Sequence, residues 1–270
     1  MRQLRSPSRW AWLLPVAAVT VIVASDNSLD GINTQGTWGF VTVGATKNDA
    51  GAHFAKTEGL FFLANLSAVP NASVFADTCA DALLIEGNSL PGVTYIDAGP
   101  SVGAILGGVD RTLERTTTAQ GISYQPAAPL PYTPGDSIVV NTTGVSGGFP
   151  TGTIRAKTAE AFAFPTDIPI PAGSEAIQLE WTAPEASGSA MVVSLRYATS
   201  QNPSVMTRTV TCTFIDDGVD SIPFRWHQNW STSSGPRAVV ATRLRTNYVA
   251  AGDANLGVVS TYQVPTPPNP

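Results

Sequence analysis

Cysteine and histidine, two side chains widely used in metal binding and nucleophilic catalysis, are rare in this chain. Its 270 residues include two cysteines, Cys79 and Cys212, and two histidines, His53 and His227. Their spacing matches no recognised zinc-binding pattern. A catalytic thiol also needs a positioned base, and the sequence places neither histidine beside one. We therefore predict no catalytic residue.

The two cysteines are instead expected to form a disulfide with each other. Cys79 and Cys212 are the simplest pair in a chain that is exported to an oxidising compartment. The alternative is a pair of buried free thiols, because Cys212 lies between Val210 and Phe214 on the apolar side of an alternating segment. The disulfide prediction therefore depends on export.

An acidic turn is the one place where the sequence suggests a metal ion. Asp216, Asp217 and Asp220 surround Gly218 and could present the carboxylate oxygens that calcium prefers. Their spacing differs from the common twelve-residue calcium loop and lacks its closing glutamate. The alternative is an acidic turn between two strands. Calcium is the only cofactor that we consider.

A short aromatic cluster could bind a sugar. Trp226 and Trp230 flank a histidine and two amides, and exposed aromatic rings beside amides are typical of sugar-binding sandwich modules. The same two tryptophans continue the alternating apolar pattern of Ile222 and Phe224, so burial in the core is the favoured interpretation.

The first 25 residues have the features of a secretory signal peptide. Arg2, Arg5 and Arg9 precede an uncharged, mostly apolar run over residues 10–24. That run is shorter than the roughly 20 residues needed to span a membrane, and Pro15 interrupts it. We expect export to the periplasm, the cell surface or the medium, with no membrane span after cleavage.

The end of this leader resembles that of a bacterial lipoprotein. In Ile22-Val23-Ala24-Ser25, however, serine stands where the lipid-bearing cysteine would be. No lipid anchor is therefore expected.

The formal net charge of −5 and the scattered basic residues argue against a nucleic-acid partner.

The rest of the chain has the composition and periodicity of an all-β protein. Only 13% of residues are charged, while the 24 glycines and 21 prolines favour many turns between short strands. Alternation of apolar and polar residues predicts half-buried strands. The inward residues are predicted to be Ile177, Leu179 and Trp181; Met191, Val193, Leu195 and Tyr197; Val210, Cys212 and Phe214; Ile222, Phe224, Trp226 and Trp230; Val240, Leu244 and Tyr248; and Val258 and Tyr262.

Strands are also predicted in the first half, where the alternation is less regular. They cover residues 37–46, 53–64, 74–84, 93–98, 121–125, 137–141 and 153–158, with a hairpin turn at 48–51. No stretch of ten or more residues has the period of a helix. We expect two antiparallel β-sandwiches of immunoglobulin-like type, with little or no helix beyond the signal peptide.

The prolines between residues 165 and 173 suggest a boundary between the two sandwiches. We assign residues 1–25 to the signal peptide, 26–158 to an N-terminal sandwich, 159–264 to a C-terminal sandwich and 265–270 to a Pro-rich tail. Cys79 and Cys212 then belong to different sandwiches, and a disulfide between them would tie the two together.

Part of the second half resembles a fibronectin type III module. The stretches over residues 179–184 and 193–197 are similar to the early strands of that family, in which a tryptophan and a tyrosine help to fill the core. More broadly, the chain resembles uncharacterised exported bacterial proteins built from β-sandwiches. Neither resemblance implies a catalytic residue.

These observations predict an exported structural, adhesive or binding protein of a bacterial cell surface or envelope. A protein or a glycan at the cell surface is the expected partner. Two alternatives remain: a carbohydrate-binding accessory module, which exposed Trp226 or Trp230 would favour, and a secreted hydrolase, which would need His53 or His227 beside a carboxylate or serine.

Overall fold

The computed structural model describes residues 35–47, 52–65, 77–83, 93–118, 121–165, 168–200 and 202–265. The expected signal peptide, the expected turn at 48–51 and residues 266–270 of the expected tail lie outside this part of the chain. Within it, no helix is long and apolar enough to cross a membrane.

Most of the described residues lie in β-strands. The strands are β1 (Gln35–Lys47), β2 (His53–Asn65), β3 (Thr78–Leu83), β4 (Thr94–Tyr95), β5 (Ser101–Leu106), β6 (Val109–Thr118), β7 (Gly121–Gln125), β8 (Leu130–Pro131), β9 (Ser137–Thr142), β10 (Gly152–Lys157), β11 (Ile177–Glu180), β12 (Ser189–Thr199), β13 (Asn202–Ile215), β14 (Val219–Ile222), β15 (Arg237–Ala251) and β16 (Ala254–Pro265). The helix is α2 (Phe224–Ser231). The prediction of an all-β chain is confirmed at this level.

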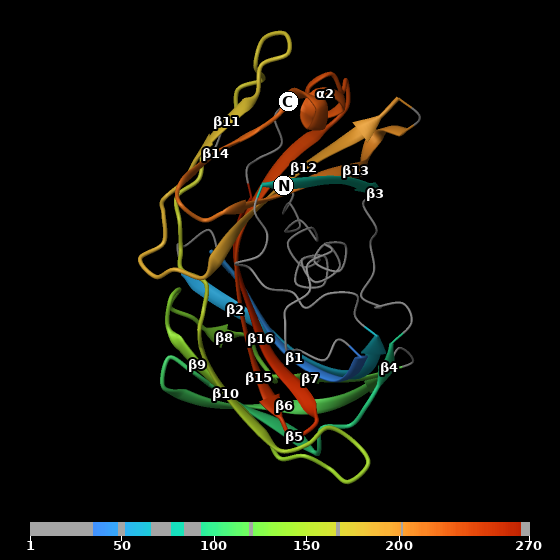
Figure 1. Ribbon diagram of the computed structural model, residues 1–270, viewed down its shortest axis with the longest axis vertical. Helices are drawn as coiled ribbons and strands as arrows, with labels where there is room; N and C mark the ends of the chain where they lie inside the picture. Colours follow the sequence, from blue (N-terminus) through green and yellow to red (C-terminus); the bar gives the residue numbers. More distant parts are fainter. Residues whose placement is uncertain are drawn as a thin grey trace, which may run out of the picture.

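Strands from both halves of the chain join one mixed sheet. Its order is β10-β9-β5-β6-β7-β2-β1-β16-β15-β12-β13-β3, with β4 and β8 added beside β2. The two halves meet where β1 pairs in parallel with β16 and where β3 pairs with β13. In Figure 1, β15 and β16 run between the part that holds β12 and β13 and the part that holds β5 to β10. The expected pair of separate immunoglobulin-like sandwiches is therefore not confirmed.

The long sheet curls so that its first strands face its middle strands across the main core. Gly152 of β10 lies against β15 and β16, where an added Cβ would be 2.8 Å from the Cβ of Ala251. Phe149, just before β10, packs edge-on against Phe61 of β2 with ring centroids 4.7 Å apart. Burial of apolar side chains between these layers is the main stabilising force in the fold.

A second buried cluster lies on the opposite face of the sheet. Because successive strand residues point to opposite faces, Val41 and Val43 enter the main core while Trp38 and Phe40 do not. Trp38 stacks on Phe40 at a centroid distance of 5.7 Å, and Phe40 stacks on Phe62 at 5.6 Å. The strands at the middle of the sheet are thus buried on both faces.

The strand expected across residues 222–230 is wrong beyond Ile222, because α2 begins at Phe224. Pro223 precedes the helix with a φ of −60°, which suits its fixed ring. Trp226 and Trp230 are four residues apart, a spacing that fits one face of a helix as well as one face of a strand. The sequence pattern there was compatible with both.

Candidate functional site

A deeply buried ion pair joins two strands of the second half. Asp216 directly follows β13, and Arg243 lies within β15. The Nε of Arg243 is 2.6 Å from Oδ2 of Asp216, and each side chain is only 1% exposed. Removing two such charges from water costs several kcal/mol, so further hydrogen bonds are needed to compensate.

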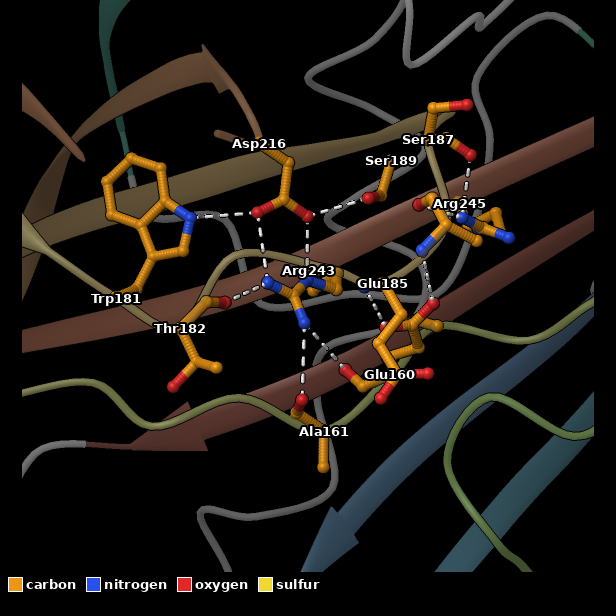
Figure 2. A network of polar contacts seen from close by, with 12 residues as sticks. Glu160, Ala161, Trp181, Thr182, Glu185, Ser187, Ser189, Asp216, Arg243 and Arg245 are labelled. Atoms are coloured by element: carbon orange, nitrogen blue, oxygen red, sulfur yellow. Dashed lines mark hydrogen bonds and ion pairs between the residues drawn. The ribbon is translucent and has the colours of Figure 1, made fainter. Parts of the chain in front are cut away.

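The carboxylate of Asp216 receives those bonds on both oxygens (Figure 2). Oδ1 accepts from Nε1 of Trp181 at 2.8 Å and from Nη2 of Arg243 at 3.0 Å. Oδ2 accepts from Oγ of Ser189 at 2.7 Å and from Nε of Arg243. Each oxygen therefore carries two hydrogen bonds, which fill its usual lone-pair directions.

The remaining donors of Arg243 hold backbone carbonyls. Nη1 donates to the carbonyl of Ala161 at 3.2 Å and to that of Glu160 at 3.5 Å. Nη2 also donates to the carbonyl of Thr182. These carbonyls belong to the segments 158–165 and 181–188, which lie outside the strands. Arg243 thus supplies partners that a sheet would otherwise provide.

Two more charged side chains extend the same arrangement. The carboxylate of Glu160 accepts from the backbone N–H of Glu185 at 2.8 Å and of Ala186 at 3.2 Å. Nη2 of Arg245 donates to the carbonyls of Ala186 at 2.6 Å and Ser187 at 2.8 Å. Figure 2 shows residues of both segments gathered around Arg243 and Arg245.

Buried hydroxyl groups hold the start of the first segment. The N–H of Ala159 donates to Oγ of Ser260 at 2.8 Å, and its carbonyl accepts from the hydroxyl of Tyr132 at 2.6 Å. Burial raises the pKa of Tyr132, so it remains a neutral donor. The backbone N–H and carbonyl of Ala159 are therefore both bound by side chains, Ser260 and Tyr132, that lie far from it in the sequence.

Chemically, this network is suited to holding the fold rather than to acting on a substrate. The oxygens of Asp216 and the nitrogens of Arg243 are occupied by protein groups, and the guanidinium lies 5.1 Å from the ring centroid of Phe162. Of the charged side chains that form these bonds, Asp216, Arg243 and Arg245 are buried, whereas Glu160 is partly exposed. We call this set of side chains the Asp216–Arg243 network.

A second polar cluster fixes the loop between β4 and β5. The N–H of Ala98 donates to the hydroxyl of Tyr124 at 2.8 Å, and that hydroxyl lies 2.8 Å from Oδ1 of Asp97 and 2.9 Å from the carbonyl of Gly99. Burial, followed by the hydrogen bond and charge of Asp97, raises the pKa of Tyr124 to about 12. Partial burial of Asp97 works the other way, but its hydrogen bonds and Arg115 outweigh it and lower the pKa of that carboxyl.

This shift predicts a loss of stability at alkaline pH. An unfolded tyrosine has a pKa of about 10, so between about pH 10 and about pH 12 the unfolded chain loses the Tyr124 proton while the folded chain keeps it. The free energy of unfolding should therefore fall as the pH rises through this range, as measured by urea denaturation. Burial also raises the pKa of Tyr248, so Tyr124→Phe should reduce the slope without removing it. An unchanged slope in Tyr124→Phe would contradict the assignment.

The predicted sugar platform is not formed by both tryptophans. Trp230 is 1% exposed and packs under Arg237, whose guanidinium carbon lies 5.5 Å from the ring centroid. Trp226 is partly exposed, with Arg225 at 5.7 Å from its ring. The burial that we favoured therefore holds for Trp230, because it faces the core from α2.

The two histidines have different surroundings. His227 is 1% exposed, and its Nε2 lies 3.0 Å from the carbonyl of Glu175 while Nδ1 lies 2.8 Å from Oγ of Ser231. Since a carbonyl only accepts, Nε2 of His227 donates to Glu175. His53 is partly exposed, and its Nε2 lies 3.1 Å from the hydroxyl of Tyr262.

The three candidate calcium ligands do not converge. Asp216 points into the core toward Arg243, whereas Asp217 is exposed on the turn and Asp220 lies on β14. Partial burial and the neighbouring carboxylates of Asp77 and Asp217 raise the pKa of Asp220. In the described part of the chain, no group of three or more histidine, cysteine, aspartate or glutamate side chains is arranged to hold a metal ion. The three aspartates therefore do not form the expected set of calcium ligands, because Asp216 is paired with Arg243.

The disulfide between Cys79 and Cys212 is confirmed. The two residues are directly opposed on the antiparallel pair β3 and β13. The bond thus joins a strand of the first half to a strand of the second half within one sheet, rather than tying two separate sandwiches together.

The sequence-based expectation that the chain contains no Gly-x-Ser-x-Gly hydrolase pattern is wrong, because residues 144–148 read Gly-Val-Ser-Gly-Gly. The N–H of Gly148 donates to the carbonyl of Val145 at 3.0 Å, which closes a tight turn. Ser146 is exposed on this turn between β9 and β10. A nucleophile elbow joins a strand to a helix, so this segment does not have that geometry.

Sequence reasoning also missed the Asp216–Arg243 network. Its one available signal was the placement of Arg243 and Arg245 two residues apart in a predicted strand, which puts two charges on one face. The pattern could not identify Asp216 as their partner, because the two residues meet only in the folded sheet.

Comparison with known proteins does not assign the chain to a family. No protein-family model and no curated protein matches it. Among solved structures, it is similar to a DUF4785 family protein from Legionella pneumophila, with 9% sequence identity and a TM-score of 0.27. The match covers 84% of this chain and 54% of that one, so the chain spans about half the length of that protein.

Proposed function

We propose that this chain is an exported structural, adhesive or binding protein of a bacterial cell surface or envelope. The observation that carries the proposal is the way its buried charges are used. Arg243, Arg245 and Asp216 direct their polar atoms to backbone and side-chain partners that hold segments outside the strands. Such a framework is rigid and keeps exposed loops in fixed positions, which suits binding through surfaces.

Two further features support export. The disulfide between Cys79 and Cys212 fits an oxidising compartment. The charged start and apolar run of residues 1–25 fit a secretory leader. These features come from different parts of the chain and lead to the same location.

Cell fractionation of a bacterium that expresses the tagged full chain tests this proposal. We expect the chain outside the cytoplasm, shortened near residue 25, with both cysteines protected from alkylation until a reductant is added. A matched variant that lacks residues 2–25 should stay in the cytoplasm with alkylatable cysteines. Recovery of the full-length chain in the cytoplasm would overturn the proposal.

Glycan binding is the second candidate, because Trp226 keeps part of its ring exposed on α2. If this ring binds sugar, Trp226→Ala should abolish retention of the folded protein on an insoluble polysaccharide. The control is Phe54→Ala, which removes another aromatic ring that is 42% exposed but lies on β2. Equal retention of Trp226→Ala and the unaltered chain would exclude this site.

A hydrolase is the third candidate, since His227 contacts Ser231 as such an enzyme would require. The two residues are four apart on α2, however, where such contacts arise from helix geometry alone, and His227 is 1% exposed. A fluorophosphonate probe should therefore leave Ser231 unlabelled. Labelling that is lost in Ser231→Ala would favour the hydrolase instead.

A further inference from the structure

We propose that the Cys79–Cys212 disulfide is a redox-controlled latch that holds β3 on the edge of the sheet. In this proposal, reduction releases β3 and uncovers the backbone edge of β13, while the rest of the sheet stays folded. The proposal concerns a conformational switch and does not depend on which surface partner the protein binds.

The position of β3 is the first observation. Among the described strands β3 is the last of the sheet order, and it pairs with β13 alone. Within the described part of the chain, the ladder hydrogen bonds of β3 therefore go to one neighbour. A terminal strand is the part of a sheet that can leave without breaking other strand pairs.

The side chains of β3 are the second observation. Of the four that the structure describes in this strand, Thr78, Ala80 and Asp81 are exposed, and only Cys79 packs against the main core. On β13, by contrast, Val210, Cys212 and Phe214 are buried. These four residues of β3 bury little apolar surface, whereas β13 stays anchored by its own side chains.

The other described side-chain contact between the two strands is weak. Nη2 of Arg208 lies 2.6 Å from Oδ2 of Asp81, and both side chains are about one-third exposed. Exposed ion pairs contribute on the order of 0–1 kcal/mol. The disulfide is therefore the strongest of the described links between β3 and the rest of the molecule.

The chemistry requires a dithiol reductant, such as a thioredoxin-like protein or dithiothreitol. Cys79 is partly exposed while Cys212 is 0% exposed, so the attacking thiolate reaches Sγ of Cys79. The sulfur–sulfur bond breaks, Cys212 leaves as a thiolate and takes up a proton. The second thiol of the reductant then displaces Cys79, which is also protonated, and the reductant becomes a disulfide. Two electrons pass from the reductant to the protein.

Hydrogen exchange measured by mass spectrometry on the full chain, with and without dithiothreitol, tests the latch. After reduction, we expect the amides of residues 78–83, and those amides of residues 208–213 that bond to β3, to exchange faster by roughly tenfold or more. Amides of β1, β15 and β16 should keep their exchange rates. The double variant Cys79→Ser/Cys212→Ser should show fast exchange in both strands with or without the reductant.

The control is Asp81→Asn with the disulfide intact, which removes the charge of the exposed pair and should leave β3 protected. Unchanged exchange of β3 in the reduced protein would overturn the proposal. Faster exchange throughout β1, β15 and β16 would also overturn it, because the disulfide would then stabilise the whole fold instead of one strand.

Discussion

Replacing Asp216 with alanine should lower the free energy of unfolding by about 3–5 kcal/mol, because it leaves the guanidinium of Arg243 buried without its counter-charge. The variant also removes acceptors from Trp181 and Ser189, whose donors point to the same carboxylate. Urea denaturation followed by circular dichroism measures the change. Asp217→Ala is the matched control, because this neighbouring carboxylate is exposed, and its effect should stay within about 0.5 kcal/mol.

A double-mutant cycle isolates the ion pair from these other losses. We expect Arg243→Ala alone to be as costly as Asp216→Ala, since it also abandons the carbonyls of Ala161 and Thr182. The double variant should be less destabilised than the sum of the two single variants by about 1–3 kcal/mol. Additive effects would mean that the two side chains stabilise the fold independently, which would contradict the network.

Replacing Phe61 with alanine should also lower the free energy of unfolding by about 3–5 kcal/mol. The ring is 0% exposed, and its centroid lies 5.3 Å from that of Tyr124 and 4.7 Å from that of Phe149. It covers Gly39, its direct partner across β1 and β2. Truncation would therefore leave a cavity in the main core, and chemical denaturation would report its cost.

The close contact between Gly39 and the ring of Phe61 allows a second test of where that ring lies. A Cβ at residue 39 would lie 2.6 Å from the ring of Phe61 and 2.8 Å from that of Phe149, so Gly39→Ala should destabilise the fold by about 1–3 kcal/mol or more. In the Phe61→Ala background the same change should cost clearly less, because one of the two rings is gone. An equal cost in both backgrounds would show that Phe61 does not confine residue 39.

Local alternation accounts for the strands that were predicted correctly. Met191, Val193, Leu195 and Tyr197 are buried on β12 and alternate with less buried neighbours, as the period of two requires. The strands β5 and β6 were missed. Of the residues of β6 whose burial the structure describes, Leu113 alone is buried, so that strand carries no alternation to detect.

The secondary-structure prediction failed where the spacing of apolar residues fits both a strand and a helix. The residues from Ile222 to Trp230 were assigned to a strand because their apolar members have even spacing, but α2 buries His227 and Trp230, which are three residues apart on one helical face. The direction that the chain takes after Pro223 and the space available against the core decide between a strand and a helix here. Neither can be read from a window of a few residues.

By itself, the sequence determined the all-β class, most strand positions and the pairing of its only two cysteines, because composition, period and cysteine number are local or countable properties. The tertiary structure alone decided that β1 pairs with β16 and that Asp216 meets Arg243. Those contacts join residues far apart in the chain, and many alternative partners have equally suitable side chains. Only the simultaneous packing of all strands selects among them.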